Sequence, residues 1–253
     1  MKMLIVISML ALAATLANAE VRAIAAEYRV GDTVLEGYFA YDDAVEGRRP
    51  GVLVVHEWWG LNDYAKRRAR ELAELGYVAF AVDMYGKGVL AKERDEAGKF
   101  AGALRGDRTL MRARVNAALE VLKGHALCDA KRTAAIGYCF GGGVVLELAR
   151  SGADVTGVVS FHGNLDTPDP ADAKNIKAKV LVCHGADDPV VPAEQVLAFE
   201  KEMRDAKVDW QMIVYGGAVH AFTNRDAGAS YNAKADARSW QHMRLFFAEV
   251  FAE

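Results

Sequence analysis

GYCFGGG, residues 137–143, has the form of a nucleophile elbow, the sharp strand-to-helix turn that usually reads Gly-x-Ser-x-Gly. Cys139 stands where a serine is usual, and Gly137 and Gly141 flank it where a side chain would crowd the turn. A helix that begins directly after the turn points its positive N-terminal end at the sulfur, which favours the thiolate. The stretch predicts a nucleophilic thiol at Cys139; the alternative is a small buried cysteine at a glycine-rich junction.

Strands and helices are predicted to alternate on both sides of this turn. Residues 26–41 predict a hairpin around Gly31 and Asp32, which should form one edge of a sheet. Apolar runs predict strands over 51–60, 77–86, 132–139, 154–163, 179–188 and 208–217, and helical patterns lie over 63–76, 91–123, 140–152, 192–206 and 236–251. This order is typical of an α/β fold with a mostly parallel central sheet and helices on both faces. Active residues in such sheets gather at the carboxyl ends of the strands.

Length and composition predict one domain after an export signal. The chain has 253 residues, 52% of them hydrophobic, which suits a single α/β domain over residues 20–253. Residues 1–19 begin with Lys2, continue as an apolar run and end in Ala17-Asn18-Ala19, a pattern typical of a secretory signal cleaved after Ala19. We therefore expect a periplasmic or secreted protein without a stable membrane span. The alternative is a retained anchor helix.

Charge and cysteine content narrow the possible partners. The formal net charge is −3, which loss of Lys2 would lower by one, and no long basic block marks a nucleic-acid surface. Three cysteines leave at least one unpaired. Cys128 and Cys183 should lie at opposite ends of their strands, too far apart for a disulfide. A bridge between Cys139 and Cys183 remains open, although the buried character of the second strand argues against it.

A thiol nucleophile needs a base and an orienting acid, which follow it in the chain in this kind of fold. HGADDPVVP, residues 184–192, places Asp187 and Asp188 just past a strand, and YGGAVHAFT, residues 215–223, places His220 just past the last strand. We assign His220 as the base, Asp188 as the acid and Asp187 as a loop-capping carboxylate, although the two carboxylates could exchange roles. Both could instead be charges at the start of the next helix.

HEWWG, residues 56–60, brings a carboxylate and backbone donors to the same edge of the sheet. We expect the backbone N–H groups of Phe140 and Trp58 to form an oxyanion hole. Glu57 is either a gate that holds the thiol protonated until substrate displaces it, or a solvated charge at a helix N-terminus. Five aromatic residues form either an apolar pocket wall or part of the core: Trp58, Trp59, Tyr85, Phe140 and Phe222. The histidines lack metal-ligand spacing.

Together these motifs resemble the dienelactone hydrolases (carboxymethylenebutenolidases), over essentially the whole mature chain. The resemblance is carried by HEWWGLN, GYCFGGG, HGADDPVVP and HAFT. It implies an α/β-hydrolase fold, a triad of Cys139, Asp188 and His220, and a Glu57 carboxylate that interacts with the resting thiol. It also implies a small ester or lactone substrate that is opened through an acyl-thiol intermediate, and no cofactor.

Two positions depart from the pattern of the dienelactone hydrolases, which hold the substrate carboxylate with arginines. Lys87 and Asn224 stand where those arginines are expected. A lysine lacks the bidentate fork of an arginine and an asparagine lacks charge, although the adjacent Arg225 could substitute. We therefore expect a hydrolase of small activated esters, lactones or thioesters. The alternatives are a true carboxymethylenebutenolidase and an idle, thiol-bearing binding or stress protein. The oligomeric state is open.

Overall fold

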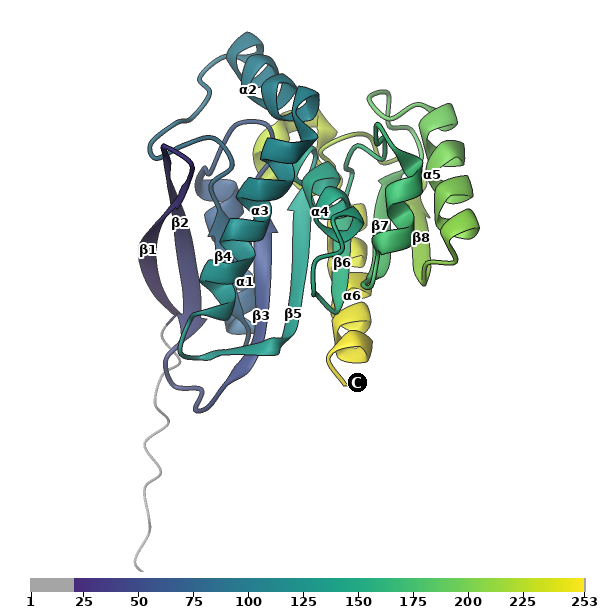
Figure 1. Cartoon of the computed structure of the whole chain (residues 1–253). Coiled ribbons are helices and arrows are strands. Elements are labelled where there is room, and N and C mark those ends of the chain that lie inside the picture. Colours follow the sequence, from purple (N-terminus) through teal and green to yellow (C-terminus); the bar gives the residue numbers. More distant parts are fainter. Residues whose placement is uncertain (1–20, 253) are drawn as a thin grey trace, which may run out of the picture.

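The computed structural model describes residues 21–252, which form an eight-stranded sheet with helices on both faces (Figure 1). The strands lie in the order β1-β2-β4-β3-β5-β6-β7-β8. All neighbours from β4 to β8 are parallel, and β1 and β2 are antiparallel additions at one edge. The strands are β1 (Val21–Val30), β2 (Thr33–Asp42), β3 (Arg49–Val55), β4 (Val78–Val82), β5 (Cys128–Tyr138), β6 (Gly157–Phe161), β7 (Lys179–Gly185) and β8 (Trp210–Tyr215).

The predicted fold class is confirmed, including the hairpin at the edge of the sheet. Val30 pairs with Thr33 at the tip of the hairpin, where Gly31 takes a φ of 56° that favours glycine. The central strands are continuous apolar runs because helices cover both of their faces; all five residues of β4 are buried.

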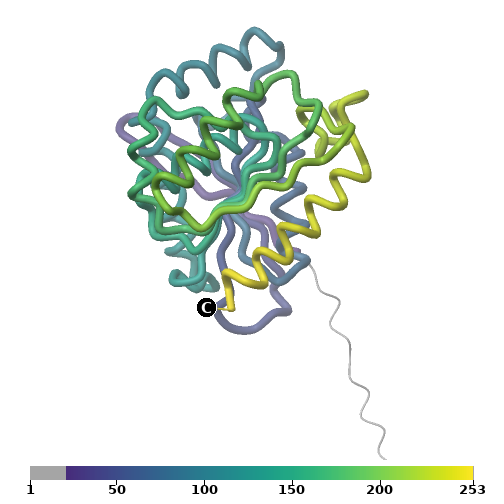
Figure 2. The backbone as a smooth tube through the Cα atoms, turned by 90° about the vertical axis from the view of Figure 1, so that its right-hand side faces the viewer, coloured from purple at the N-terminus to yellow at the C-terminus, as the bar shows by residue number. Residues whose placement is uncertain are grey.

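Two groups of helices cover the two faces of the sheet (Figures 1 and 2). Helices α2, α3, α4 and α5 belong to one hydrophobic cluster, and α1 and α6 belong to the other. In β3 the side chains of Leu53 and Val55 enter the first cluster, whereas Val52 and Val54 enter the second, as the alternation of a strand requires. The helices are α1 (Asp63–Glu74), α2 (Arg94–Gly106), α3 (Arg108–Lys123), α4 (Phe140–Arg150), α5 (Ala193–Ala206) and α6 (Ala233–Val250).

The helical region predicted over residues 91–123 is two helices rather than one. The break falls at Asp107, whose side chain accepts a hydrogen bond from the Leu110 backbone N–H at 2.9 Å and so caps α3. This break allows α2 to leave the face of the sheet and lie above the carboxyl ends of the strands (Figure 1). Helix α2 therefore stands over the region where active residues are expected.

The predicted signal at residues 1–19 lies outside the described residues. Within residues 21–252, no helix has the length and apolar character needed to cross a membrane.

Candidate active site

The elbow at the end of β5 holds Cys139 in a strained backbone conformation with a φ of 53°. Glycine is required on both sides of it. A Cβ atom on Gly137 would lie 2.0 Å from the Gly141 carbonyl oxygen, and one on Gly141 would lie 2.3 Å from the Val55 carbonyl oxygen. The turn is therefore tight enough to present the thiol directly at the N-terminus of α4.

The backbone of Cys139 is fixed by two acceptors at the end of β6. Its N–H lies 3.0 Å from the Phe161 carbonyl oxygen and 3.2 Å from Nδ1 of His162. His162 is fully buried and has a φ of 40°, which is unusual for a residue other than glycine. Because Nδ1 accepts, the neutral ring carries its proton on Nε2 and donates it to Thr223 Oγ1 at 2.7 Å. Burial holds the pKa of His162 well below its usual value.

The predicted acid and base lie together at the ends of β7 and β8. His220 Nδ1 lies 2.9 Å from Asp188 Oδ2. The other oxygen of Asp188 accepts the backbone N–H groups of Val190 at 2.8 Å and Val191 at 3.3 Å. Asp187 is exposed. Of the two neighbouring carboxylates, the geometry therefore gives Asp188 the position of the orienting acid.

The charged forms of His220 and Asp188 stabilise each other. Burial by itself would lower the pKa of His220, but the hydrogen bond to Asp188 and the sulfur of Cys139 raise it to about 10. Burial would likewise raise the pKa of Asp188, yet the hydrogen bond from His220 and the two backbone donors hold it below its usual value. His220 Nε2 is buried and has no hydrogen-bond partner of normal geometry among the described residues. The arrangement favours the protonated form of the His220 ring.

Glu57 follows β3 and lies inside the site, only 3% exposed. Its Oε2 accepts a hydrogen bond from the Asn224 side-chain amide at 2.7 Å. Burial raises the pKa of Glu57 to about 7, although Asn224 and the charge of His220 partly oppose this. The expected contact of Glu57 with the resting thiol is absent from the hydrogen bonds of residues 21–252, because Asn224 holds the carboxylate instead. Because its side chain is buried, Glu57 is not the solvated charge at a helix N-terminus that was the alternative interpretation.

These side chains open into a cavity of about 760 Å³, called here the main cavity. Predicted residues that line it are Cys139, His220, Glu57, Trp58, Trp59 and Asn224. Trp58 and Trp59 pack edge to face at 5.2 Å between ring centres and form an apolar part of the wall. Pro189, Val190 and Leu90 add further apolar surface.

Three residues predicted to contact the substrate do not line the main cavity. Lys87 lies in the loop after β4 and forms ion pairs with Glu27 and Glu36 on the edge hairpin. Phe222 is fully buried, because it packs in the core against neighbouring rings. Tyr85 is buried against Phe140 and donates its hydroxyl to the Trp58 carbonyl oxygen at 3.0 Å.

The predicted oxyanion donors belong to two segments, Phe140 to the start of α4 and Trp58 to the loop after β3. Phe140 is the first residue of α4, where the helix offers no internal partner for its N–H. Its ring is buried in the core, whereas Trp58 lines the main cavity. The oxyanion hole itself stays a prediction.

Sequence reasoning did not assign Arg94 and Arg105, which both line the main cavity from α2. Nor did it assign His162 its position behind the elbow. The location of His162 at the end of a predicted strand, one residue after a buried phenylalanine, is a signal that could have identified it. No comparable signal marks the two arginines, since their role depends on where α2 lies.

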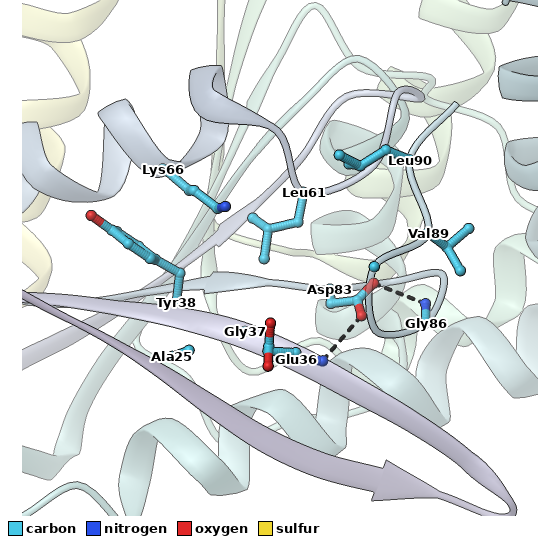
Figure 3. Close-up of a pocket in the computed structure, with 11 residues that line it drawn as sticks. Ala25, Glu36, Gly37, Tyr38, Leu61, Lys66, Asp83, Gly86, Val89 and Leu90 are labelled. Carbon is cyan, nitrogen blue, oxygen red and sulfur yellow. Dashed lines mark hydrogen bonds between the residues drawn. The ribbon is translucent and has the colours of Figure 1, made fainter. Parts of the chain in front are cut away.

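A second cavity, of about 130 Å³, lies between the edge hairpin, α1 and the loop after β4 (Figure 3). Asp83 faces it, but both carboxylate oxygens already accept backbone N–H groups, from Glu36 at 3.1 Å and from Gly86 at 2.9 Å among others. Leu90 borders both cavities. All three cysteines are free and buried, and the described residues contain no group of three or more potential metal-binding side chains.

Comparison with known proteins identifies a family match over most of the chain. The model of the dienelactone hydrolase family matches residues 35–251. Protein usf of Aquifex pyrophilus is 31% identical over 205 residues, which are 79% of this chain and 88% of that protein. A carboxymethylenebutenolidase homologue of Aquifex aeolicus is 30% identical over 226 residues, covering 87% of this chain and 96% of the homologue.

Solved structures agree with this match. A dienelactone hydrolase-like promiscuous phosphotriesterase from metagenomic libraries superimposes with a TM-score of 0.88 at 44% identity, covering 91% of this chain and 99% of the other. Dienelactone hydrolase from Anabaena variabilis, at 23% identity and a TM-score of 0.63, covers 88% of this chain and 98% of its own and shares the fold.

Proposed function

Since the chain belongs to the dienelactone hydrolase family, we propose that it hydrolyses small activated esters, lactones or thioesters through an acyl-thiol intermediate on Cys139. The observation that carries the proposal is the relay of a strained elbow thiol, the His220 ring and the buried Asp188 at one edge of the main cavity. A nucleophile, a base and an orienting acid are the parts that covalent acyl transfer requires.

In the first half of the reaction the Cys139 thiolate attacks the substrate carbonyl carbon. A carbon–sulfur bond forms, the ester carbon–oxygen bond breaks, and the leaving oxygen takes a proton from the His220 imidazolium when it needs one. The carbonyl oxygen becomes negative in the tetrahedral intermediate, and the N–H groups of Phe140 and Trp58 are the proposed donors to it.

The second half of the reaction, release of the acid, uses the same residues after His220 has given up its proton. Acylation removes the negative charge of the sulfur, which had helped to keep His220 protonated, so the ring can act as a base. It takes a proton from water, the hydroxide attacks the thioester carbon, and the carboxylic acid leaves as Cys139 returns to the thiolate. Asp188 orients the ring throughout.

Glu57 is proposed as an electrostatic regulator of this pair rather than as a direct cap on the thiol. Its pKa of about 7, raised by burial, places its charge change near neutral pH. A charged Glu57 favours the protonated His220 and hence the thiolate, whereas a neutral Glu57 does not. We therefore expect the rate of acylation to contain an ionisation near pH 7 that Glu57→Gln removes.

The proposal is tested by burst kinetics with p-nitrophenyl acetate on the reduced protein, with intact mass measured during turnover. We expect the wild type to carry an acetyl adduct that disappears with time, and Cys139→Ala to carry none. Cys139→Ser tests the sulfur apart from the geometry of the turn, because a hydroxyl in the same place is much harder to deprotonate than a thiol. A reduced, folded wild type without an adduct would contradict the hydrolase mechanism.

A second candidate activity is phosphotriester hydrolysis, which the relative of 44% identity favours because it is described as a promiscuous phosphotriesterase. Paraoxon turnover by the wild type, lost in Cys139→Ala, is the result that would support it. Carboxymethylenebutenolidase activity proper is tested separately, by turnover of dienelactone itself.

Export is proposed from residues 1–19 alone, because they fit a cleaved signal. Expression of the full chain in a bacterial host, followed by fractionation and N-terminal sequencing, tests it. A periplasmic protein that begins at Glu20 is the expected result, and a full-length cytoplasmic protein would contradict it.

A further inference from the structure

The ring of His162 joins the turn that carries the thiol to the loop that carries the proposed base. Strand β6 lies between β5 and β7 in the sheet, so its end stands beside the Cys139 turn and near the loops that follow β7 and β8 (Figure 1). One ring nitrogen of His162 accepts the Cys139 N–H at 3.2 Å, and the other is hydrogen-bonded to Thr223 Oγ1 at 2.7 Å. Thr223 comes three residues after His220 in the same loop. A single side chain therefore connects the segments of the proposed nucleophile and base.

The same ring packs directly against the proposed base. The rings of His162 and His220 lie edge to face, with 5.3 Å between their centres and 66° between their planes. Asp188 holds His220 through Nδ1, and one hydrogen bond leaves a ring free to tilt. Contact with a fixed neighbouring ring restricts that tilt, so His162 also supports the orientation of His220.

The far end of this connection is itself anchored. Thr223 is buried, and its hydroxyl is also hydrogen-bonded to the Tyr64 hydroxyl at 2.7 Å. Its carbonyl oxygen accepts a hydrogen bond from Arg68 at 2.9 Å. Tyr64 and Arg68 are buried residues of α1, which packs on the sheet. The ring of His162 is therefore tied to the body of the fold through Thr223.

The backbone of His162 indicates a role beyond ending a strand. Its φ of 40° is a conformation that few residues other than glycine adopt, and such strain gathers at functional sites because surrounding contacts impose it. The neutral ring is also fully used, since Nδ1 accepts one hydrogen bond and the Nε2 proton is donated to another. The ring thus has no lone pair free for a proton from His220, and it does not act as a second base.

We propose that His162 is a positioning residue that keeps the Cys139 turn and the His220 loop at the separation needed for proton transfer between sulfur and imidazole. This rests on the proposed function, because it says how that pair is kept in reach. Proton transfer requires hydrogen-bond distance, and a misplacement of about 1 Å can cost about a hundredfold in rate. Loosening the connection should therefore slow acylation without changing the number of competent molecules.

The test measures two quantities in the burst with p-nitrophenyl acetate, its rate constant and its amplitude per folded molecule. Thr223→Val keeps nearly the same shape but removes the hydroxyl that His162 contacts. We expect the burst rate constant to fall by at least about tenfold while the amplitude stays unchanged. Thr223→Ser keeps the hydroxyl and should retain most of the wild-type rate.

A double-mutant cycle tests whether the two residues act as one connection. His162→Asn suits the left-handed backbone and offers an acceptor near the Cys139 N–H, but its side chain is too short to keep the contact with Thr223. It should slow the burst, and the double variant with Thr223→Val should be no slower than the slower single variant, because both changes break the same connection. Rate losses that multiply in the double variant would mean that the residues act separately, and would overturn the proposal.

A matched control separates positioning from support of the fold. Thr133→Val removes another buried threonine hydroxyl, which lies 3.5 Å from the Asp154 carbonyl oxygen, in β5 away from its carboxyl end. It should lower stability in urea but leave the burst rate constant unchanged. A Thr223→Val variant with a smaller amplitude and the wild-type rate constant would show only structural support and would overturn the positioning role. If Thr223→Val does not fold, Tyr64→Phe replaces it, because it removes the other partner of that hydroxyl.

The outcomes also separate this inference from the proposed function. A reduced, folded wild type that forms no acetyl adduct on Cys139 would defeat the acyl-thiol mechanism and the positioning role together. A wild type that is acylated normally, beside Thr223→Val and His162→Asn variants that are acylated at the same rate, would overturn only the role of His162.

Discussion

Replacing Glu57 by glutamine is expected to change how the stability of the protein depends on pH. The carboxyl group is 3% exposed and accepts a hydrogen bond from Asn224. Glutamine has nearly the same shape, and its amide oxygen can accept the same hydrogen bond. The substitution therefore removes an ionisable group from the interior without opening a cavity.

The size of the effect follows from the pKa of Glu57, which burial raises from 4.5 to about 7. Between these two values the unfolded chain has released the proton while the folded protein still holds it. The free energy of unfolding therefore falls by about 1.4 kcal/mol for each pH unit in this window. The stability present below the unfolded pKa is lost as pH rises through the folded pKa, a total of about 3 kcal/mol.

The assay is urea unfolding of wild type and Glu57→Gln at several pH values from 5 to 8. The difference in unfolding free energy between variant and wild type should shift by about 2.5 kcal/mol in favour of the variant across this range, because the rest of the change lies below pH 5. Glu120→Gln, which changes an exposed carboxylate on α3, is the control and should follow the wild type. Parallel curves for wild type and Glu57→Gln would refute the reasoning.

Three other substitutions test the site and its support. Asp188→Asn removes the acceptor that orients His220 and should lower kcat on p-nitrophenyl acetate by about a thousandfold; a loss below tenfold would mean that the ring is held by other contacts. Gly137→Ala would place a Cβ atom 2.0 Å from the backbone oxygen four residues on, so it should lower stability by at least about 3 kcal/mol in thermal unfolding, and an unchanged Tm would contradict the tight turn. Asp236→Asn weakens a buried ion pair with Arg68 and should cost about 2 kcal/mol in urea unfolding; a neutral result would show that the remaining partners of Arg68 suffice.

The residues of the proposed triad could be brought together from the sequence because each lies at or within five residues of the end of a strand. In a parallel sheet those ends meet at one edge, so the chain order of nucleophile, acid and base was enough to select Cys139 and His220. The choice between Asp187 and Asp188 could not be made by order, since the two are adjacent. The course of one loop decides it, and that course is set by backbone hydrogen bonds that leave no pattern in the sequence.

The residues that line the main cavity could be predicted less well from the sequence, because the lining depends on how segments distant in sequence meet. Lys87 was expected at the substrate, but the edge hairpin brings two glutamates to it. Arg105 reaches the cavity only because the helical region breaks at Asp107 and α2 turns over the strand ends. Neither the pairing nor the turn has a periodic signature.

The three residues of the proposed triad lie on segments that are far apart along the chain, and this separation has a consequence for biosynthesis. Cys139 belongs to the middle of the chain, whereas His220 comes after β8, the last strand of the sheet. A chain made from its N-terminus therefore exposes the cysteine long before the histidine exists.

Until β8 has joined the edge of β7, the sulfur lacks its proposed proton acceptor, because His220 follows that strand. It remains an ordinary thiol with little reactivity at neutral pH. In the proposed mechanism the fold thus delays the completion of the reactive group until the polypeptide is nearly finished.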